Sequence, residues 1–140
     1  MLADQRLKHA YTLLPHGQAL QAITDIIYLT PEHIHCIVKT PINSPLCDEA
    51  NSLSSFSCVE YAAQAAAIHG ILMGATYDPL KPAFIGAIKD LQLARSHYAN
   101  TQTVTIIAQQ EYSENNGAIY SFSGDADGER LLTGRLILKK

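Results

Sequence analysis

One carboxylate stands in a long apolar segment of the sequence. Residues 56–76 (FSCVEYAAQAAAIHGILMGAT) contain Glu60 as their only acidic residue and have no lysine or arginine. Burying a carboxylate is costly unless it is paired or used, and desolvation raises its pKa toward the range that a general acid or base needs near neutral pH. Gln64 follows one helical turn later and could orient the Glu60 carboxylate or a ligand amide. Glu60 is therefore the first candidate catalytic residue.

A structural role for Glu60 is the alternative. The residues Ser57-Cys58-Val59-Glu60 match the S-x-x-E pattern of a helix capping box, in which Ser57 caps the helix and Glu60 reaches back to the cap amide. In that arrangement both side chains satisfy backbone groups at the start of the helix. The sequence leaves both possibilities open.

The remaining reactive side chains form no recognisable catalytic or metal motif. His69 lies nine residues after Glu60, which places it on the opposite side of a helix, and we expect it to be structural. His33 and His35 share one face of a predicted strand, but Cys36 points to the other face and no second ligand pair follows, so no metal site is expected. A serine or cysteine nucleophile arrangement and a glycine-rich phosphate loop are both missing from the sequence.

The first part of the chain predicts a short helix and two strands. Residues 3–14 have an amphipathic helical pattern that Pro15 ends, and the segments 21–30 and 33–40 have the composition and alternation of two paired strands. Residues 41–55 then follow neither period and contain two prolines. Because long irregular segments are uncommon in compact domains, we expect an ordered loop that lines a site.

The second part predicts a buried helix followed by strands. Residues 56–76 are apolar nearly all round, which is typical of a buried helix. A stripe of small residues along this helix would let another backbone approach closely; it comprises Ala63, Ala67, Gly70 and Gly74. With turns at Asn116-Gly117 and Asp127-Gly128, four strands are expected over residues 83–93, 103–112, 118–124 and 131–138. A four-strand antiparallel meander in a curved sheet around a long central helix gives an α+β fold.

Length and composition limit the class of protein. The 140 residues are expected to form one domain, 1–140, and the charged fraction of 16% lies below the usual ~25%, which suggests an oligomer or an apolar ligand site. A formal net charge of −3 without a basic run argues against nucleic-acid binding, and no apolar stretch approaches the ~18 residues of a membrane span. The start of the sequence shows no export signal, and an odd number of cysteines without a CxxC motif is typical of buried thiols in a reducing cytoplasm; these are Cys36, Cys47 and Cys58.

Two short motifs and the strands that follow them are shared with a known family. The motifs are Leu13-Leu14-Pro15-His16, and Glu60-Tyr61-Ala62-Ala63-Gln64-Ala65 followed by His69-Gly70. Over essentially its whole length the sequence resembles the hotdog-fold 3-hydroxyacyl-ACP dehydratases, and most of all the small subfamily found with aryl-polyene pigment clusters. The resemblance implies a central helix in a curved sheet, a dimer through edge strands and no cofactor except the 4′-phosphopantetheine arm of an acyl carrier protein, which enters a tunnel between helix and sheet near the subunit interface.

The resemblance also implies roles for particular residues. In the family a histidine removes the α-proton of the 3-hydroxyacyl thioester, a helix carboxylate of the other subunit protonates the departing hydroxyl, and backbone amides polarise the thioester carbonyl. Glu60 matches the carboxylate, and Gln64, Ala63 and Leu46 are expected to contact the substrate. The family's histidine belongs to a His-Phe-Pro-Gly loop fourteen residues before the carboxylate, where this sequence has Leu46. A replacement within this chain would most plausibly be His16.

Three functions remain open on this basis. The chain is a stand-alone dehydratase that uses His16, one half of a heteromeric dehydratase whose related hotdog partner supplies the histidine, or a thioesterase in which Glu60 activates water. A scaffolding subunit without its own chemistry is the non-enzymatic form of the second. The two dehydratase functions rank first because hotdog sites lie between subunits. An acyl carrier protein is acidic, so Lys89 and Arg95 are candidates for its docking patch.

Overall fold

The computed structural model describes residues 5–13, 22–39, 48, 52–74 and 84–139. The elements in chain order are α1 (Gln5–Leu13), β1 (Ile23–Leu29), β2 (His33–Val38), β3 (Ser52–Ser54), α2 (Ser57–Leu72), β4 (Phe84–Leu93), β5 (His97–Ala99), β6 (Val104–Glu114), β7 (Gly117–Ala126) and β8 (Glu129–Lys139). Every helix and strand expected from the sequence pattern is present, with ends that differ from the prediction by a few residues.

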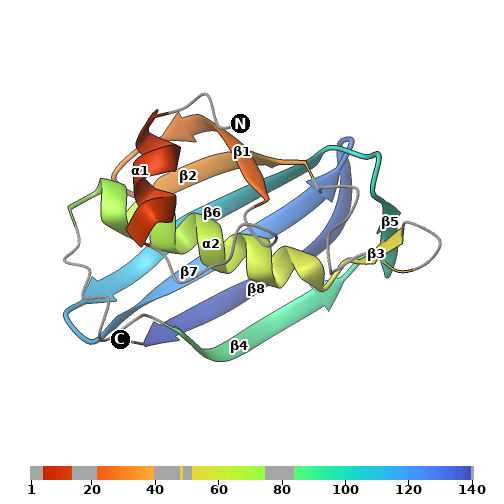
Figure 1. Cartoon of the computed structure of the whole chain (residues 1–140). Coiled ribbons are helices and arrows are strands. Elements are labelled where there is room, and N and C mark those ends of the chain that lie inside the picture. Colours follow the sequence, from red (N-terminus) through yellow and green to blue (C-terminus); the bar gives the residue numbers. More distant parts are fainter. Residues whose placement is uncertain (1–4, 14–21, 40–47, 49–51, 75–83, 140) are drawn as a thin grey trace.

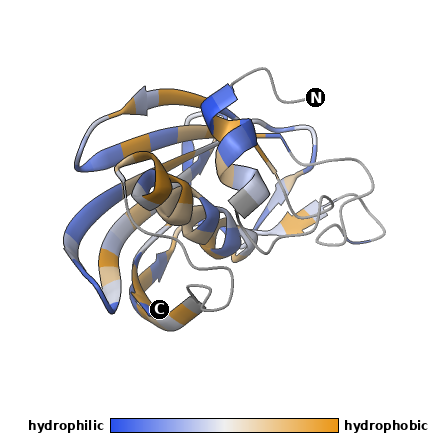
Figure 2. Cartoon of the chain, turned by 60° about the vertical axis from the view of Figure 1, so that its left-hand side comes forward, coloured by the Kyte–Doolittle hydropathy of each residue, from blue (hydrophilic) through white to orange (hydrophobic). Residues whose placement is uncertain are grey.

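The architecture is a long helix lying across one face of an antiparallel sheet (Figure 1). The strand order is β1-β2-β6-β7-β8-β4, and α1 packs on α2 and β1 at one end. Alternate residues of the strands face α2 and form the core; on β6 and β7 these include Val104, Ile106, Ala108, Tyr120 and Phe122. Figure 2 shows the matching alternation of hydrophobic and hydrophilic residues along the strands. The expected α+β fold, a buried central helix wrapped by an antiparallel sheet, is confirmed.

The position of β4 differs from the prediction. Strands β6, β7 and β8 form consecutive hairpins, but β4 pairs with β8 at the edge of the sheet, with Ile88 opposite Leu136. The expected four-strand meander was therefore wrong. Residues 94–103, including the short strand β5, separate β4 from β6, so no tight turn forces these two strands together. As an edge strand, β4 leaves large apolar side chains exposed: Ile88, Leu91 and Leu93.

Part of the segment expected to be an irregular loop is a strand. β3 pairs with β5 in a separate two-stranded sheet, where Leu53 lies opposite Tyr98 and both side chains are buried. Strands of three residues carry too little pattern to be recognised in a sequence, and they form here because a distant partner is available. Residues 41–47 and 49–51, with Leu46 and Cys47, lie outside the described residues.

Both predicted hairpins are present, with the first turn one residue earlier than the predicted Asn116-Gly117, and their glycines serve different purposes. Asp127 and Gly128 have φ values of 48° and 85°, and a two-residue type I′ turn requires positive φ at both positions. In the other hairpin the turn residues are Asn115 and Asn116, and Gly117 begins β7. A side chain at Gly117 would collide with the backbone carbonyl oxygen of Leu138, so glycine permits a close approach of the two strands.

Two of the three cysteines are core side chains. Cys36 and Cys58 are free thiols that lie fully buried, and burial raises the pKa of each to about 12, so both stay protonated at neutral pH. The expectation of buried thiols is confirmed for these two. Neither of the helices that the structure describes is long and apolar enough to cross a lipid bilayer.

Candidate active site

The start of α2 decides between the two roles considered for Glu60. The helix begins at Ser57, with Phe56 in the N-cap position and no capping hydrogen bond from a side chain. The Ser57 hydroxyl instead lies 2.9 Å from Tyr98 Oη. A capping box needs Ser57 itself in the N-cap position, so that alternative is wrong. Glu60 stands inside the first turn and is half-buried.

A chain of hydrogen bonds leads from the backbone of β1 to the Glu60 carboxylate. The Ile23 amide donates to Tyr11 Oη (3.1 Å), and Tyr11 Oη donates to Gln64 Oε1 (2.7 Å). Gln64 Nε2 in turn donates to Glu60 Oε1 (3.3 Å). Tyr11 is 5% exposed and Gln64 is fully buried. The structure thus confirms the contact between Gln64 and Glu60 that their spacing of one helical turn predicts.

Glu60 lies on the face of α2 that is least covered by the described residues. Ala63, Ala67 and Gly70 follow on the same side of the helix and are half-buried, whereas the residues between them are mostly buried. The stripe of small residues therefore extends from Glu60 along this face instead of packing into the core. The close approach of helix and sheet occurs elsewhere, where a side chain on Gly124 would meet Cys58 Sγ at 3.0 Å.

His69 is held in the core on the other side of α2. Its Nε2 lies 2.9 Å from the Thr30 carbonyl oxygen, which can only accept, so Nε2 carries the proton. Its Nδ1 lies 2.7 Å from Tyr120 Oη and accepts from that hydroxyl, to which Gln110 Nε2 donates (3.1 Å). Every polar atom of the ring has a partner, and burial lowers the pKa of His69. His69 is a neutral structural histidine, as its position opposite Glu60 predicts.

This histidine makes stability depend on pH. Because the folded pKa lies below the ordinary value of 6.5, the unfolded chain takes up a proton first as the pH falls. Stability from the neutral ring is fully present above pH 6.5 and is lost as the pH falls from there through the lowered folded pKa. Urea denaturation is expected to give a lower midpoint at pH 5.5 than at pH 7.5. The pKa of His35 is also lowered, chiefly by burial, so His35→Gln is the control and should retain most of the pH dependence.

The other described histidines belong to different surfaces. His33 and His35 are half-buried on one face of β2 and Cys36 is buried on the other, as the alternation predicts. His9 and His97 are exposed, on α1 and β5. Across the residues described, no three histidine, cysteine or acidic side chains are grouped so that they could hold a metal ion.

The remaining predicted site residues are distributed as follows. His16 and Leu46 lie outside the described residues. Lys89 is exposed on the edge strand β4. Arg95, just after β4, is exposed but forms an ion pair with Glu129 (2.6 Å), which compensates its charge. Lys89 is thus the better placed of the two basic candidates for contact with an acidic surface.

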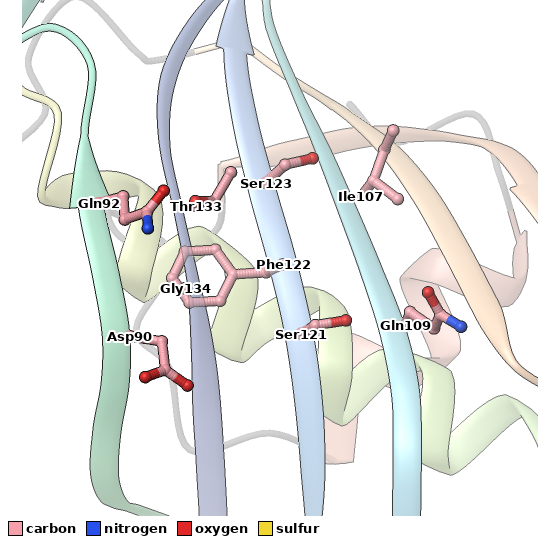
Figure 3. A pocket seen from close by; sticks show the side chains of 9 residues that line it. All are labelled: Asp90, Gln92, Ile107, Gln109, Ser121, Phe122, Ser123, Thr133 and Gly134. Carbon is pink, nitrogen blue, oxygen red and sulfur yellow. The ribbon is translucent and has the colours of Figure 1, made fainter.

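A shallow hollow of about 380 Å³ lies on the face of the sheet away from α2 (Figure 3). Hydroxyl and amide side chains from β4, β6, β7 and β8 line most of it, among them Gln92, Gln109, Ser121, Ser123 and Thr133. Ser121 and Ser123 alternate along β7 with Tyr120 and Phe122, which are buried toward α2. The hollow is therefore separated from Glu60 by the sheet and is not part of the candidate active site.

The sequence was compared with models of known protein families and with curated proteins. The family model described as ApeP-like, ApeP dehydratase, matches residues 8–139. The chain belongs to this family. A search of curated protein sequences found no match.

Solved structures show the same fold as this ApeP-like chain. The dehydratase heterocomplex ApeI:P from Xenorhabdus doucetiae matches with a TM-score of 0.80 and 17% identity, over 94% of this chain and 90% of that one. The PaaI protein of the phenylacetic acid degradation operon of E. coli has a TM-score of 0.67 and 15% identity, over 96% of this chain and 92% of that one. A hypothetical thioesterase with coenzyme A from Streptococcus pneumoniae has a TM-score of 0.63 and 9% identity, over 95% of this chain and 92% of that one. At these identities the likeness shows the hotdog fold, which dehydratases and thioesterases share.

Tyr11 belongs to the candidate site but was not predicted from the sequence. Its hydroxyl contacts Gln64, yet the amphipathic pattern of residues 3–14 was used only to predict a helix. Leu7, Ala10 and Tyr11 are spaced three and four apart and are all buried, so the helical period placed Tyr11 on the inner face. A buried tyrosine needs a hydrogen-bond partner for its hydroxyl, and that need was the available signal.

Proposed function

We propose that this ApeP-like chain is a subunit of a 3-hydroxyacyl-[acyl-carrier-protein] dehydratase, which removes water from a 3-hydroxyacyl thioester to give the trans-2-enoyl thioester. The observation that carries this proposal is the Glu60 carboxylate, half-buried on the least covered face of α2 and held there by Gln64. Membership of the ApeP-like dehydratase family favours elimination of water as its chemistry. Substrates of the aryl-polyene type, in the cytoplasm, fit the subfamily that the sequence resembles.

In this proposal Glu60 acts as the general acid. The protonated carboxyl group gives its proton to the departing 3-hydroxyl group, while a histidine base removes the α-proton and the C–O bond breaks. Gln64 donates to Oε1, so the transferred proton is carried by Oε2. The electron pair of the broken Cα–H bond forms the new double bond, and water leaves. The first three half-buried residues that follow Glu60 on α2 are Ala63, Ala67 and Gly70, and their small size leaves room for an acyl chain along this part of the helix.

We propose that the histidine comes from a second hotdog subunit. The His-Phe-Pro-Gly loop of the resembled family is absent from this sequence, and the corresponding position is Leu46. The described histidines supply no obvious substitute, because His69 is bonded on both ring nitrogens and the others occupy different surfaces. The structurally similar ApeI:P protein is a heterocomplex. The edge strand β4, with its exposed apolar side chains, is the expected site of pairing, since unpaired edges bind further strands.

An acyl carrier protein is the proposed donor of the substrate, and no other cofactor is required. Its acidic surface would meet the subunit near Lys89, which is exposed on β4 close to the proposed subunit boundary. Arg95 is the weaker candidate because Glu129 compensates its charge. Thioester hydrolysis, with Glu60 activating water, is the second candidate function, and the similarity of fold to a hypothetical thioesterase favours it.

Mass spectrometry of the acyl thioester tests these proposals together. The purified chain is incubated with a 3-hydroxyacyl carrier protein, first alone and then with a hotdog subunit that carries the His-Phe-Pro-Gly loop. We expect the acyl chain to lose one water in the mixture at a rate at least 10²-fold higher than with the chain alone, since one acid or base is typically worth 10²–10⁴ in rate. Loss of water by the chain alone, abolished by His16→Ala, would establish the stand-alone enzyme. Release of a free acid would identify a thioesterase.

A further inference from the structure

The hydrogen-bond chain that ends at Glu60 begins on a different helix. The side-chain amide of Gln64 has two orientations of similar shape, which present either its oxygen or its NH₂ group to Glu60. Tyr11 Oη accepts from the Ile23 amide at 3.1 Å, so its single proton is available for Gln64 Oε1 at 2.7 Å. With its oxygen occupied in this way, Gln64 turns its NH₂ group toward Glu60 Oε1, 3.3 Å away.

We infer that Tyr11 is a positioning residue for the general acid: it fixes the orientation of the Gln64 amide and thereby directs the proton of Glu60 toward the substrate. This inference rests on the proposed function, in which Glu60 is the acid. It adds a residue of α1 to a site otherwise built on α2.

The alternative orientation shows what Tyr11 prevents. If the Gln64 amide turned over, its carbonyl oxygen would face Glu60 and accept the carboxyl proton, which would then point away from the substrate. The turned amide would also favour the protonated carboxyl group, whereas the NH₂ group favours the carboxylate. Burial raises the pKa of the Tyr11 hydroxyl, and the charge of Glu60 raises it slightly further. The hydroxyl therefore keeps its proton, and remains a hydrogen-bond donor, at all relevant pH values.

The test compares two tyrosines bonded to the same helix. Tyr11→Phe removes the hydroxyl that contacts Gln64. Tyr98→Phe is the matched control. The Tyr98 side chain is also buried, with 2% of its surface exposed, and its hydroxyl forms a hydrogen bond with Ser57 of α2, one turn before Glu60. In the form of the enzyme that is active, Tyr11→Phe should lower kcat about 10- to 100-fold, the equivalent of one hydrogen bond to a charged group, with KM nearly unchanged. Tyr98→Phe should leave kcat close to that of the wild type.

A double-mutant cycle tests whether Tyr11 acts through Gln64. Gln64→Leu removes the amide, so adding Tyr11→Phe to that variant should cause no further loss of kcat. If Tyr11→Phe is too unstable to assay, 4-fluorophenylalanine at position 11 nearly keeps the size of the side chain, cannot donate to Gln64 and accepts only weakly from the Ile23 amide. It should lower kcat by the same 10- to 100-fold that is expected for Tyr11→Phe. An additional loss in the Gln64→Leu background, equal to the loss in the wild type, would overturn the inference.

A second measurement is independent of the reaction. The side-chain carboxyl carbon of Glu60, assigned by the loss of its signal in Glu60→Gln, reports the titration of Glu60 directly in NMR spectra, whichever way the Gln64 amide is turned. In Tyr11→Phe the midpoint of that titration should rise by about one pH unit, and in Tyr98→Phe it should not. An unchanged midpoint in Tyr11→Phe would refute the role of Tyr11. Absence of dehydration by the wild type, alone and with the partner, would instead refute the proposed function.

Discussion

Glu60→Gln is expected to lower the rate of dehydration about 10²–10⁴-fold while the chain remains folded. The glutamine has the size of the glutamate and keeps an oxygen that can accept from Gln64 Nε2. It has no acidic proton to give to the departing hydroxyl group. Mass spectrometry of the acyl thioester measures the rate, in the chain alone or in the mixture, whichever is active.

Stability and a second carboxylate provide the controls for Glu60→Gln. Glu111→Gln makes the same chemical change on β6, where the carboxylate bonds Arg135 at 2.6 Å on the outer face of the sheet, and should leave the rate unchanged. The free energy of unfolding should change by less than about 1 kcal/mol in both variants, as is usual for exposed or half-buried side chains. A Glu60→Gln protein that is fully active but less stable would show that the carboxylate has a structural role after all.

The elements with a strong local pattern could be predicted from the sequence. The apolar segment 56–76 predicted the central helix, observed over Ser57–Leu72, because no proline or charge run interrupts it. The turn at Asp127-Gly128 predicted the last hairpin, because a type I′ turn needs residues that tolerate positive φ. The partners of β4 could not be predicted in this way, since no short turn ties it to a neighbour and its position depends on which edge of the sheet remains open.

The candidate site was predicted in part for similar reasons. Glu60 was recognisable because a carboxylate in an apolar segment has to be explained, and Gln64 because it lies one helical turn away. The capping box was a reasonable alternative because Ser57-Cys58-Val59-Glu60 has its sequence pattern, and the position of the N-cap at Phe56 together with the contact of Ser57 with Tyr98 decides against it. Tyr11 and Tyr98 reach α2 from distant segments, and such contacts depend on tertiary packing that the local pattern does not contain.

His69→Leu is expected to lower the free energy of unfolding by about 2–6 kcal/mol without a direct effect on the reacting atoms. The leucine fills a similar volume, but it leaves the Thr30 carbonyl oxygen and the Tyr120 hydroxyl without their bonds to the ring. A buried polar group that loses its partner costs about 1–3 kcal/mol, and two such groups are affected. This is a large part of the 5–15 kcal/mol that is typical of a folded domain. Urea denaturation at pH 7.5 measures the loss.

The tyrosine partner shows whether that loss comes from the hydrogen bonds. Tyr120→Phe removes one hydroxyl from the network and should cost about 1–2 kcal/mol. The double variant with both substitutions should be less destabilised than the sum of the two, because no Tyr120 hydroxyl proton then remains without its acceptor beside the leucine. Additive losses would mean that His69 and Tyr120 stabilise the chain independently. A His69→Leu protein that is as stable as the wild type but inactive would contradict the structural role and make His69 a candidate for the missing base.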